Sequence, residues 1–307
     1  MMTNKAKGAQ LSFRERLRSK EEWFTGYLFV APAMIIFVMF VFYPFSNTII
    51  FSFQETSLLN PEVNWIGFDN YRRLFSDQFF MVIRQTTYFV LGTVIVGTVL
   101  ALLTALLLTK PLKFIGFYRT VFYLPVVTSM VAVSVVWLWM YEPRFGIINH
   151  LLGFFGVPQI NWLTDTRTAM PAIIILAIWR DLGYRATIFM AGIFSIPTEL
   201  YEAAKIDGAN SWNCFWRITL PLLQPTTFFV VVTSVIASFQ VFAPVNIMTS
   251  GGPADSTNVV VFYMWRYAFR YFQMGYASAV AVALALVIFA VTFIQWKLGG
   301  NKNFSMG

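Results

Sequence analysis

The chain is poor in the side chains that most often carry chemistry in proteins. Its 307 residues include one cysteine, Cys214, and one histidine, His150. A single cysteine permits no internal disulfide and no cysteine-based metal site. A histidine in a predicted loop with no second ligand nearby indicates a surface residue rather than a metal ligand. We therefore expect no metal and no cofactor on this chain.

Charge is scarce as well, since Asp, Glu, Lys and Arg make up 12% of the residues and hydrophobic residues 58%. The formal net charge of +8 does not indicate a nucleic-acid partner, because the basic residues do not gather with aromatic side chains on one soluble face. The chain also lacks the Gly-x-x-x-x-Gly-Lys-Ser/Thr loop that cradles nucleotide phosphates. It is therefore not expected to hydrolyse ATP by that mechanism.

What the chain has instead is long apolar segments. About 20 apolar residues are enough to cross roughly 30 Å of hydrocarbon. The first 22 residues are polar and basic, and the apolar run after them is too long for a removable signal peptide. We predict an all-α membrane protein with six transmembrane helices, the first of which could continue to residue 53. The predicted spans are 23–45, 86–108, 120–140, 169–194, 228–248 and 276–296.

The basic residues indicate which ends of these spans face the cytoplasm. The N-terminal leader, the second and fourth loops and the C-terminal tail hold 13 of the 22 Lys and Arg residues, including all eight lysines. Basic residues concentrate in cytoplasmic loops, so both termini and the fourth loop should be cytoplasmic. The predicted organisation is a leader over 1–22, one membrane domain over 23–300 and a tail over 301–307.

The fourth loop, residues 195–222, carries the most specific pattern. Its first part predicts a short helix that Thr198 can cap and that Gly208 can end in a left-handed conformation. Asn210 or Ser211 can cap a second short helix, which bears several aromatic residues. Two such helices form either a projection that another protein grips or a hairpin that rests on lipid headgroups.

The residues of this loop resemble a known family. The run Glu202-Ala203-Ala204, Gly208, Ile218 and Leu220-Pro221 is similar, in every spacing, to the cytoplasmic loop of bacterial ATP-binding-cassette (ABC) importer permeases. The resemblance extends from about Trp23 to Trp296. It implies a type I ABC importer permease fold in the bacterial cytoplasmic (inner) membrane, with a coupling helix over 202–210 that docks into an ATPase subunit. The residues that it implies for coupling are Glu202, Ala203, Ala204, Asp207, Gly208, Leu220 and Pro221.

Two further segments narrow the resemblance to one branch. Residues 249–253, Thr-Ser-Gly-Gly-Pro, and 276–279, Tyr-Ala-Ser-Ala, look like those of the maltose and glycerol-phosphate permeases, which mostly import sugars. The resemblance implies a permease subunit, not an enzyme, in a membrane-embedded complex that transports a sugar. The implied partners are a second homologous permease, two ATPase subunits that hold ATP and Mg, and an extracytoplasmic solute-binding protein.

Three charges lie in the middle of the fourth predicted span. Arg180 is 11 residues from Ala169, which places it roughly 16 Å deep. Asp181 and Arg185, at i and i+4, can form an ion pair within the helix, which would leave Arg180 facing a cavity or a partner subunit. Ionisable groups inside a membrane are candidates for function, although packing between subunits is the alternative.

Hydroxyl and aromatic side chains on the fourth and fifth spans suit a sugar, because sugar hydroxyls need hydrogen bonds and sugar ring faces stack on aromatic rings. Small residues that permit close helix packing are the alternative explanation. In the maltose importer these two helices contact the substrate. The resemblance therefore implies a substrate path lined by Arg180, Tyr184, Ser234, Ser238 and Phe242. Val241 and Ala177 stand where the maltose importer has polar residues, so a different sugar or a permease half that does not bind substrate is also compatible.

Other functions stay open at this stage. The solute could be glycerol phosphate or another polar molecule. From a different class, the chain could be an ion-coupled secondary transporter with Arg180 and Asp181 as relay groups, or a membrane scaffold with no transport path. The sequence does not identify the sugar or the partner subunits.

Overall fold

The computed structural model describes residues 13–57, 59, 62–111 and 113–299. The predicted tail, 301–307, and the first 12 residues of the predicted leader lie outside these residues. From Phe13 onward the leader is helical and runs without interruption into the first span.

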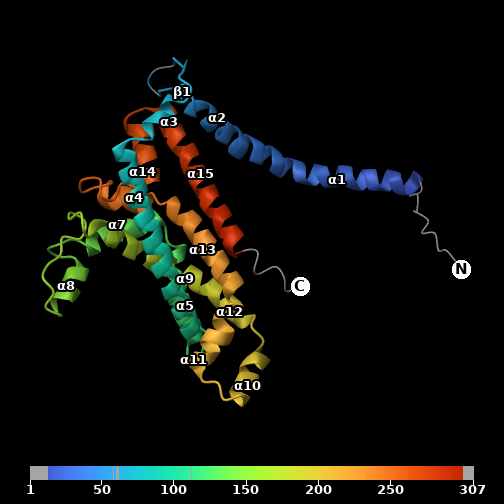
Figure 1. The fold of residues 1–307 in the computed structure, drawn as a ribbon, viewed down its shortest axis with the longest axis vertical. Helices are drawn as coiled ribbons and strands as arrows, with labels where there is room; N and C mark the ends of the chain where they lie inside the picture. Colours follow the sequence, from blue (N-terminus) through green and yellow to red (C-terminus); the bar gives the residue numbers. More distant parts are fainter. Residues whose placement is uncertain (1–12, 58, 60–61, 112, 300–307) are drawn as a thin grey trace.

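The first span is one long helix that points away from the rest of the chain (Figure 1). It consists of α1 (Phe13–Phe37), the π-helical turn η1 (Val38–Phe42) and α2 (Tyr43–Ser52), so the predicted extension toward residue 53 is confirmed. The wider turn η1 lies immediately before Pro44, whose ring crowds the carbonyl four residues earlier. Only the end of this span packs on the body, where α2 contacts α15 (Met274–Gly299).

Two more spans are unbroken and apolar. One consists of α4 (Asp77–Leu91), η2 (Gly92–Val96) and α5 (Gly97–Leu108), and the other is α15. The first of these begins at Asp77 rather than at the predicted residue 86, because Ser76 caps it by accepting a hydrogen bond from the Phe79 N–H at 3.4 Å. The fourth span, α9 (Ala169–Phe194), has the predicted bounds and carries the three predicted charges.

The remaining two spans are bent. The prediction of one continuous helix over 120–140 is wrong: α6 (Ile115–Val127) and α7 (Met130–Met140) meet at 100°, because the backbone is extended at Thr128. The fifth span starts from α11 (Ser211–Cys214), η3 (Phe215–Thr219) and α12 (Leu220–Leu222), and bends by 63° into α13 (Gln224–Phe239). By length and composition, three helices among the described residues could cross a membrane, or up to five if each bent pair counts as one span; α9, with its three charges, is the sixth long segment of the bundle.

The prediction of a continuous helix up to residue 248 is also wrong. Helix α13 stops at Phe239, residues 241–242 are not helical, and η4 (Val245–Thr249) follows. Pro244 supplies the physical reason, because it has no N–H for the carbonyl of Gln240. The fifth span is therefore interrupted close to its C-terminal end.

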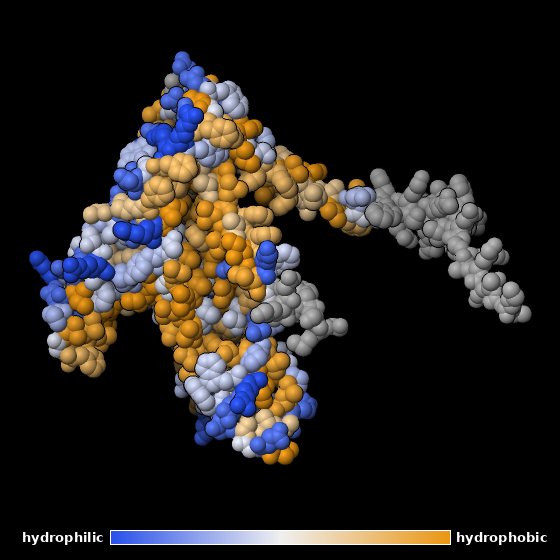
Figure 2. All heavy atoms as spheres, viewed as in Figure 1, coloured by the Kyte–Doolittle hydropathy of each residue, from blue (hydrophilic) through white to orange (hydrophobic). Residues whose placement is uncertain are grey.

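The core of the molecule lies around α9, which contacts α4, α5, α6 and α13. The fully buried Ala101 and Ala105 of α5 meet Ala186 of α9 in one cluster, and such small residues allow helix backbones in a membrane to approach closely. Hydrophobic residues cover the middle of the molecule, and hydrophilic ones gather toward its ends (Figure 2).

Short elements occupy the two ends of the bundle (Figure 1). At one end lie the antiparallel strands β1 (Gln54–Glu55) and β2 (Asn64–Trp65), with α3 (Asp69–Arg73), α14 (Val260–Trp265) and the π-helical turn η5 (Arg266–Arg270). Helix α8 (Ile147–Gly153) lies apart from them, at the side of the bundle (Figure 1). At the other end α10 (Thr198–Ile206) and α11 form a projection.

Candidate functional site

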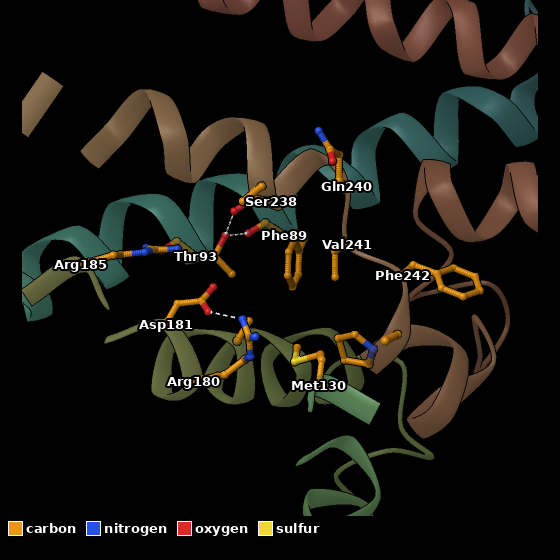
Figure 3. A pocket seen from close by; sticks show the side chains of 14 residues that line it. Phe89, Thr93, Met130, Arg180, Asp181, Arg185, Ser238, Gln240, Val241 and Phe242 are labelled. Carbon is orange, nitrogen blue, oxygen red and sulfur yellow. Dashed lines mark hydrogen bonds and ion pairs between the residues drawn. The ribbon is translucent and has the colours of Figure 1, made fainter. Parts of the chain in front are cut away.

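A cavity of about 370 Å³ lies in the body of the bundle. Figure 3 shows its walls: α9 on one side, the end of α4 with η2 on another, and the interrupted fifth span on the third. Phe89 and Val241 point into it, and Ser238 lies at its edge beside Thr93. The interruption after α13 therefore forms part of the cavity wall. Irregular backbone at membrane depth is tolerated where it lines a cavity.

The charges of α9 pair differently from the prediction. Arg180 Nη1 donates to Asp181 Oδ1 at 2.7 Å, and both side chains are about 30% exposed, at 27% and 31%. The predicted ion pair between Asp181 and Arg185 is absent from the described salt bridges, because the Arg185 guanidinium reaches across to the neighbouring span. The prediction that Arg180 is unpaired is therefore wrong. Its Nε is nonetheless buried with no hydrogen-bond partner among the described residues.

Arg185 holds a π-helical turn. It is 5% exposed, and its Nη1 donates to the Thr93 carbonyl at 2.7 Å. Thr93 belongs to η2, and the absence of a side chain at Gly97 leaves room for the guanidinium, since a Cβ there would collide with Arg185 Nη1. A π-turn offsets backbone carbonyls from their usual donors. Arg185 thus stabilises the wall of the cavity and does not form an ion pair with Asp181.

Thr93 also joins the two spans that face α9. Its Oγ1 lies 3.0 Å from Ser238 Oγ and donates to the Phe89 carbonyl at 2.8 Å. The pair ties η2 to the end of α13, one turn before the interruption. Two hydroxyls, an amide, a carboxylate and two guanidiniums therefore border a cavity whose other lining residues are mostly apolar.

The projection at the other end has the predicted turn. Gly208 has φ +76°, the Ala209 N–H donates to the Ala204 carbonyl at 2.8 Å and the Gly208 N–H to the Lys205 carbonyl at 3.0 Å. These are the two hydrogen bonds of a Schellman motif. Asn210 caps α11 by accepting from the Asn213 N–H at 2.8 Å, as predicted.

Two details of the projection complete its geometry. The predicted cap by Thr198 is wrong, since Pro197 occupies the cap position and no side chain bonds there. Tyr201 Oη and Thr219 Oγ1 lie 2.9 Å apart and fasten α10 to the helix that leads into the fifth span. This contact connects α10 directly to the segment that leads into α13.

Residues 97–297 match the profile of a family described as the binding-protein-dependent transport system inner membrane component. The chain belongs to this family.

Among its relatives is the arabinooligosaccharides transport system permease protein AraP of Halalkalibacterium halodurans. It is 33% identical over 277 residues, which cover 89% of this chain and 87% of that protein. The sn-glycerol-3-phosphate transport system permease protein UgpA of Agrobacterium fabrum is 34% identical over 275 residues, covering 88% and 93%. A crystal structure of a bacterial ABC transporter involved in the import of the acidic polysaccharide alginate contains a chain with a TM-score of 0.82 and 26% identity, covering 94% of this chain and 100% of that one.

The chain is thus a transport subunit with the type I ABC importer permease fold, not an enzyme. Membership in this family confirms the resemblance drawn from residues 202–221. It also favours ATP-driven import over the ion-coupled transporter and the scaffold.

The permease cavity contains part of the predicted substrate path. Arg180, Ser238 and Phe242 line it, whereas Tyr184 and Ser234 do not. Ser234 is buried one helical turn before Ser238, where α13 is packed against its neighbours, and Tyr184 is 44% exposed on α9 beyond the cavity. Helical spacing did not separate these residues, because on α9 the lining includes Arg185 but not Tyr184, and on α13 it begins only at Ala237.

Sequence reasoning missed several residues of the cavity wall, among them Phe89, Thr93 and Gln240. For Gln240 a signal was present, since Pro244 four residues later leaves its carbonyl without the usual donor. For Phe89 and Thr93 no signal was present, because an apolar span that contains a threonine is common in membranes.

The seven predicted coupling residues lie on the projection or at its base. Glu202, Ala203, Asp207, Gly208 and Pro221 are exposed, and Ala204 and Leu220 are half-buried. They form a surface at the end of the permease that carries the lysines Lys110 and Lys205.

Proposed function

We propose that this permease carries a sugar, either a monosaccharide or an oligosaccharide, through the cavity between α9 and the interrupted fifth span. The observation that carries the proposal is the composition of this cavity. It combines the Arg180–Asp181 pair, the Ser238 and Thr93 hydroxyls and the Phe89 and Phe242 rings. Sugars need hydrogen-bond donors and acceptors together with an aromatic face.

The Arg180–Asp181 pair favours a neutral polyhydroxyl solute over a phosphate ester, since the second arginine of the lining, Arg185, already donates to the Thr93 carbonyl. A guanidinium alone would attract the phosphate of glycerol phosphate, and a relative named for that solute makes this the second candidate. Asp181, at 2.7 Å from Arg180, places a carboxylate where the phosphate would bind. A sugar hydroxyl can donate to Asp181 and accept from Arg180, and the unpartnered Arg180 Nε offers one more donor.

The size of the cavity suits a small solute or a short part of a chain. Its volume of about 370 Å³ is near the lower end of the roughly 300–1,000 Å³ of small-molecule sites. The relatives named for arabinooligosaccharides and alginate import longer molecules. An oligosaccharide would therefore pass through this site one part at a time.

We further propose that α10 is the coupling helix and docks into an ATPase subunit. The exposed Glu202 and Ala203 form the contact, and the Schellman motif at Gly208 fixes the angle between α10 and α11. ATP and Mg would be held by two ATPase subunits, because this sequence has no phosphate-binding loop. The other proposed partners are a second homologous permease and an extracytoplasmic solute-binding protein. Both termini are proposed to be cytoplasmic, on the evidence of the lysines.

Uptake by proteoliposomes that contain the whole complex tests the function. We expect ATP-dependent, vanadate-sensitive uptake of a labelled sugar, and competition by related sugars but not by glycerol phosphate. Uptake driven by an ion gradient without ATP would overturn the ATP-driven mechanism. Uptake of glycerol phosphate in preference to every sugar would overturn the solute assignment.

A further inference from the structure

A second cavity, of about 540 Å³, lies between the end of α5 and the α10–α11 projection. From α5 it is lined by Leu103, Leu106 and Lys110, and from α10 by Tyr201 and Lys205. Trp212, Phe215 and the buried thiol of Cys214 form the wall on the side of the second short helix. This cavity is separate from the one between α9 and α13, and transport of a solute does not account for it.

The two ends of this cavity differ in chemistry. Leu103 precedes Lys110 by seven residues, which is about 10 Å along a helix axis. Lys110 follows the end of α5, so we expect it at headgroup depth, and we expect Leu103, which is 50% exposed, at acyl-chain depth. Trp and Tyr side chains favour the level between these two environments. Trp212 and Tyr201 line the same cavity as these lysines and leucines.

The charged end is positive and uncompensated. Among the described residues that line the cavity none is acidic, and neither Lys110 nor Lys205 forms a salt bridge with another described residue. The two ammonium groups come from different elements and line the same space. An anion with an attached apolar tail satisfies both ends of the cavity, whereas a soluble anion would leave Leu103 and Leu106 exposed to water.

We propose that this cavity binds one anionic phospholipid of the inner leaflet, with its headgroup phosphate between Lys110 and Lys205 and an acyl chain along Leu103 and Leu106. The lipid would fill the space between α5 and the projection, and so brace the α10 helix against the bundle. The inference does not depend on which solute the permease carries. It depends on a cytoplasmic position of Lys110 and Lys205, which the distribution of lysines among the loops predicts.

Lipid binding can be measured on the full chain, purified in a neutral detergent with the subunits that accompany it. Phosphatidylglycerol, phosphatidylcholine and inorganic phosphate are titrated separately, and the bound lipid is counted by native mass spectrometry. We expect phosphatidylglycerol to bind more tightly than phosphatidylcholine. Because each lysine near the surface contributes about a fivefold gain in affinity for anionic lipid, Lys110→Gln with Lys205→Gln should weaken phosphatidylglycerol binding by roughly 25-fold.

Matched variants locate the site. Lys297→Gln removes an exposed lysine near the end of α15 that does not line the cavity, and should leave the affinity unchanged. Leu106→Trp should fill the acyl end and reduce binding, whereas Leu107→Trp, on the neighbouring exposed position, should not. Cys214 adds a local readout in the unmodified chain, since phosphatidylglycerol should slow its alkylation by N-ethylmaleimide.

Three results would overturn the proposal. The first is equal phosphatidylglycerol binding by the double lysine variant and the unmodified chain. The second is equal binding of phosphatidylcholine and phosphatidylglycerol. The third is protection of Cys214 by inorganic phosphate as effective as that by phosphatidylglycerol, which would assign the site to a soluble phosphate instead of a lipid.

Discussion

Gly208→Val changes the preferred backbone conformation at one turn of the coupling loop and leaves the other properties of that loop unchanged. Gly208 has φ +76°, and a Cβ added there would meet nothing within 4 Å. The substitution therefore introduces backbone strain without a steric collision. For a residue with a Cβ the left-handed conformation costs about 1–3 kcal/mol, which lowers the population of the observed turn roughly 5- to 150-fold.

The consequence should be loss of coupling rather than loss of folding. The strain falls on the two hydrogen bonds of the Schellman motif, and α10 is only nine residues long. We expect the variant to insert in the membrane and to assemble at normal yield, while solute uptake and solute-stimulated ATP hydrolysis fall at least tenfold. Gly208→Asn should restore much of the activity, because asparagine tolerates this conformation better than other residues.

Gly156 provides a matched control. It also has a left-handed conformation, φ +74°, with open space where a Cβ would be, but it lies in the loop after α8, outside the projection. Gly156→Val therefore introduces the same intrinsic strain away from the projection and should leave coupling intact. If Gly208→Val kept normal solute-stimulated ATP hydrolysis, or if Gly156→Val reduced it equally, the turn at Gly208 would not be the coupling element.

Three further predictions concern the cavity, the helix packing and the topology. Ser238→Trp should place an indole in the cavity and abolish uptake without lowering the yield of assembled complex. The control Phe229→Trp, at an exposed position on the same helix, should be tolerated. Near-normal uptake by Ser238→Trp would show that this face does not line the solute path. Gly97→Ala should displace Arg185 from the Thr93 carbonyl and lower the free energy of unfolding by about 1.5–3 kcal/mol, measured as a lower melting temperature in detergent. The control Gly116→Ala adds a Cβ in open space and should not destabilise the protein. Equal melting temperatures of the two variants would contradict the role of Arg185. In a Cys214→Ser background, a cysteine that replaces the exposed Phe155 should react with a membrane-impermeant thiol reagent added to intact cells. A cysteine that replaces the exposed Ile206 should react only after lysis. The reverse pattern would show that the topology is inverted.

Local patterns predicted the projection well, because its geometry depends on residues close together in the sequence. Gly208 ends α10 and Asn210 caps α11 through hydrogen bonds that span only a few residues. Apolar length likewise located the six long segments, but it did not show that two of them are bent. The wrong cap at Thr198 shows the limit of such patterns, since the proline before it takes the cap position and has no side-chain acceptor.

The pairing of the charges could not be predicted in the same way. Helical spacing permits Asp181 to pair with Arg185, but Arg185 is long enough to reach a different span, and the Thr93 carbonyl in η2 is available there. The choice depends on the absence of a side chain at Gly97, a residue 88 positions away in the sequence. Once Arg185 is engaged, Asp181 pairs with its neighbour Arg180.

The interruption of the fifth span connects these observations to the cavity. The composition shows that residues 228–248 are apolar. It does not show whether they form one helix, because a broken span and a straight span bury similar side chains. Pro244 has no N–H to donate to the Gln240 carbonyl, and a carbonyl without a hydrogen bond in hydrocarbon would cost several kcal/mol. The break is stable only where polar groups lie nearby, and the wall opposite it holds Arg180 and Asp181. The charges on α9 and the proline of the fifth span are therefore parts of one feature: each would be costly alone in the membrane, and together they form a cavity that is polar and partly accessible.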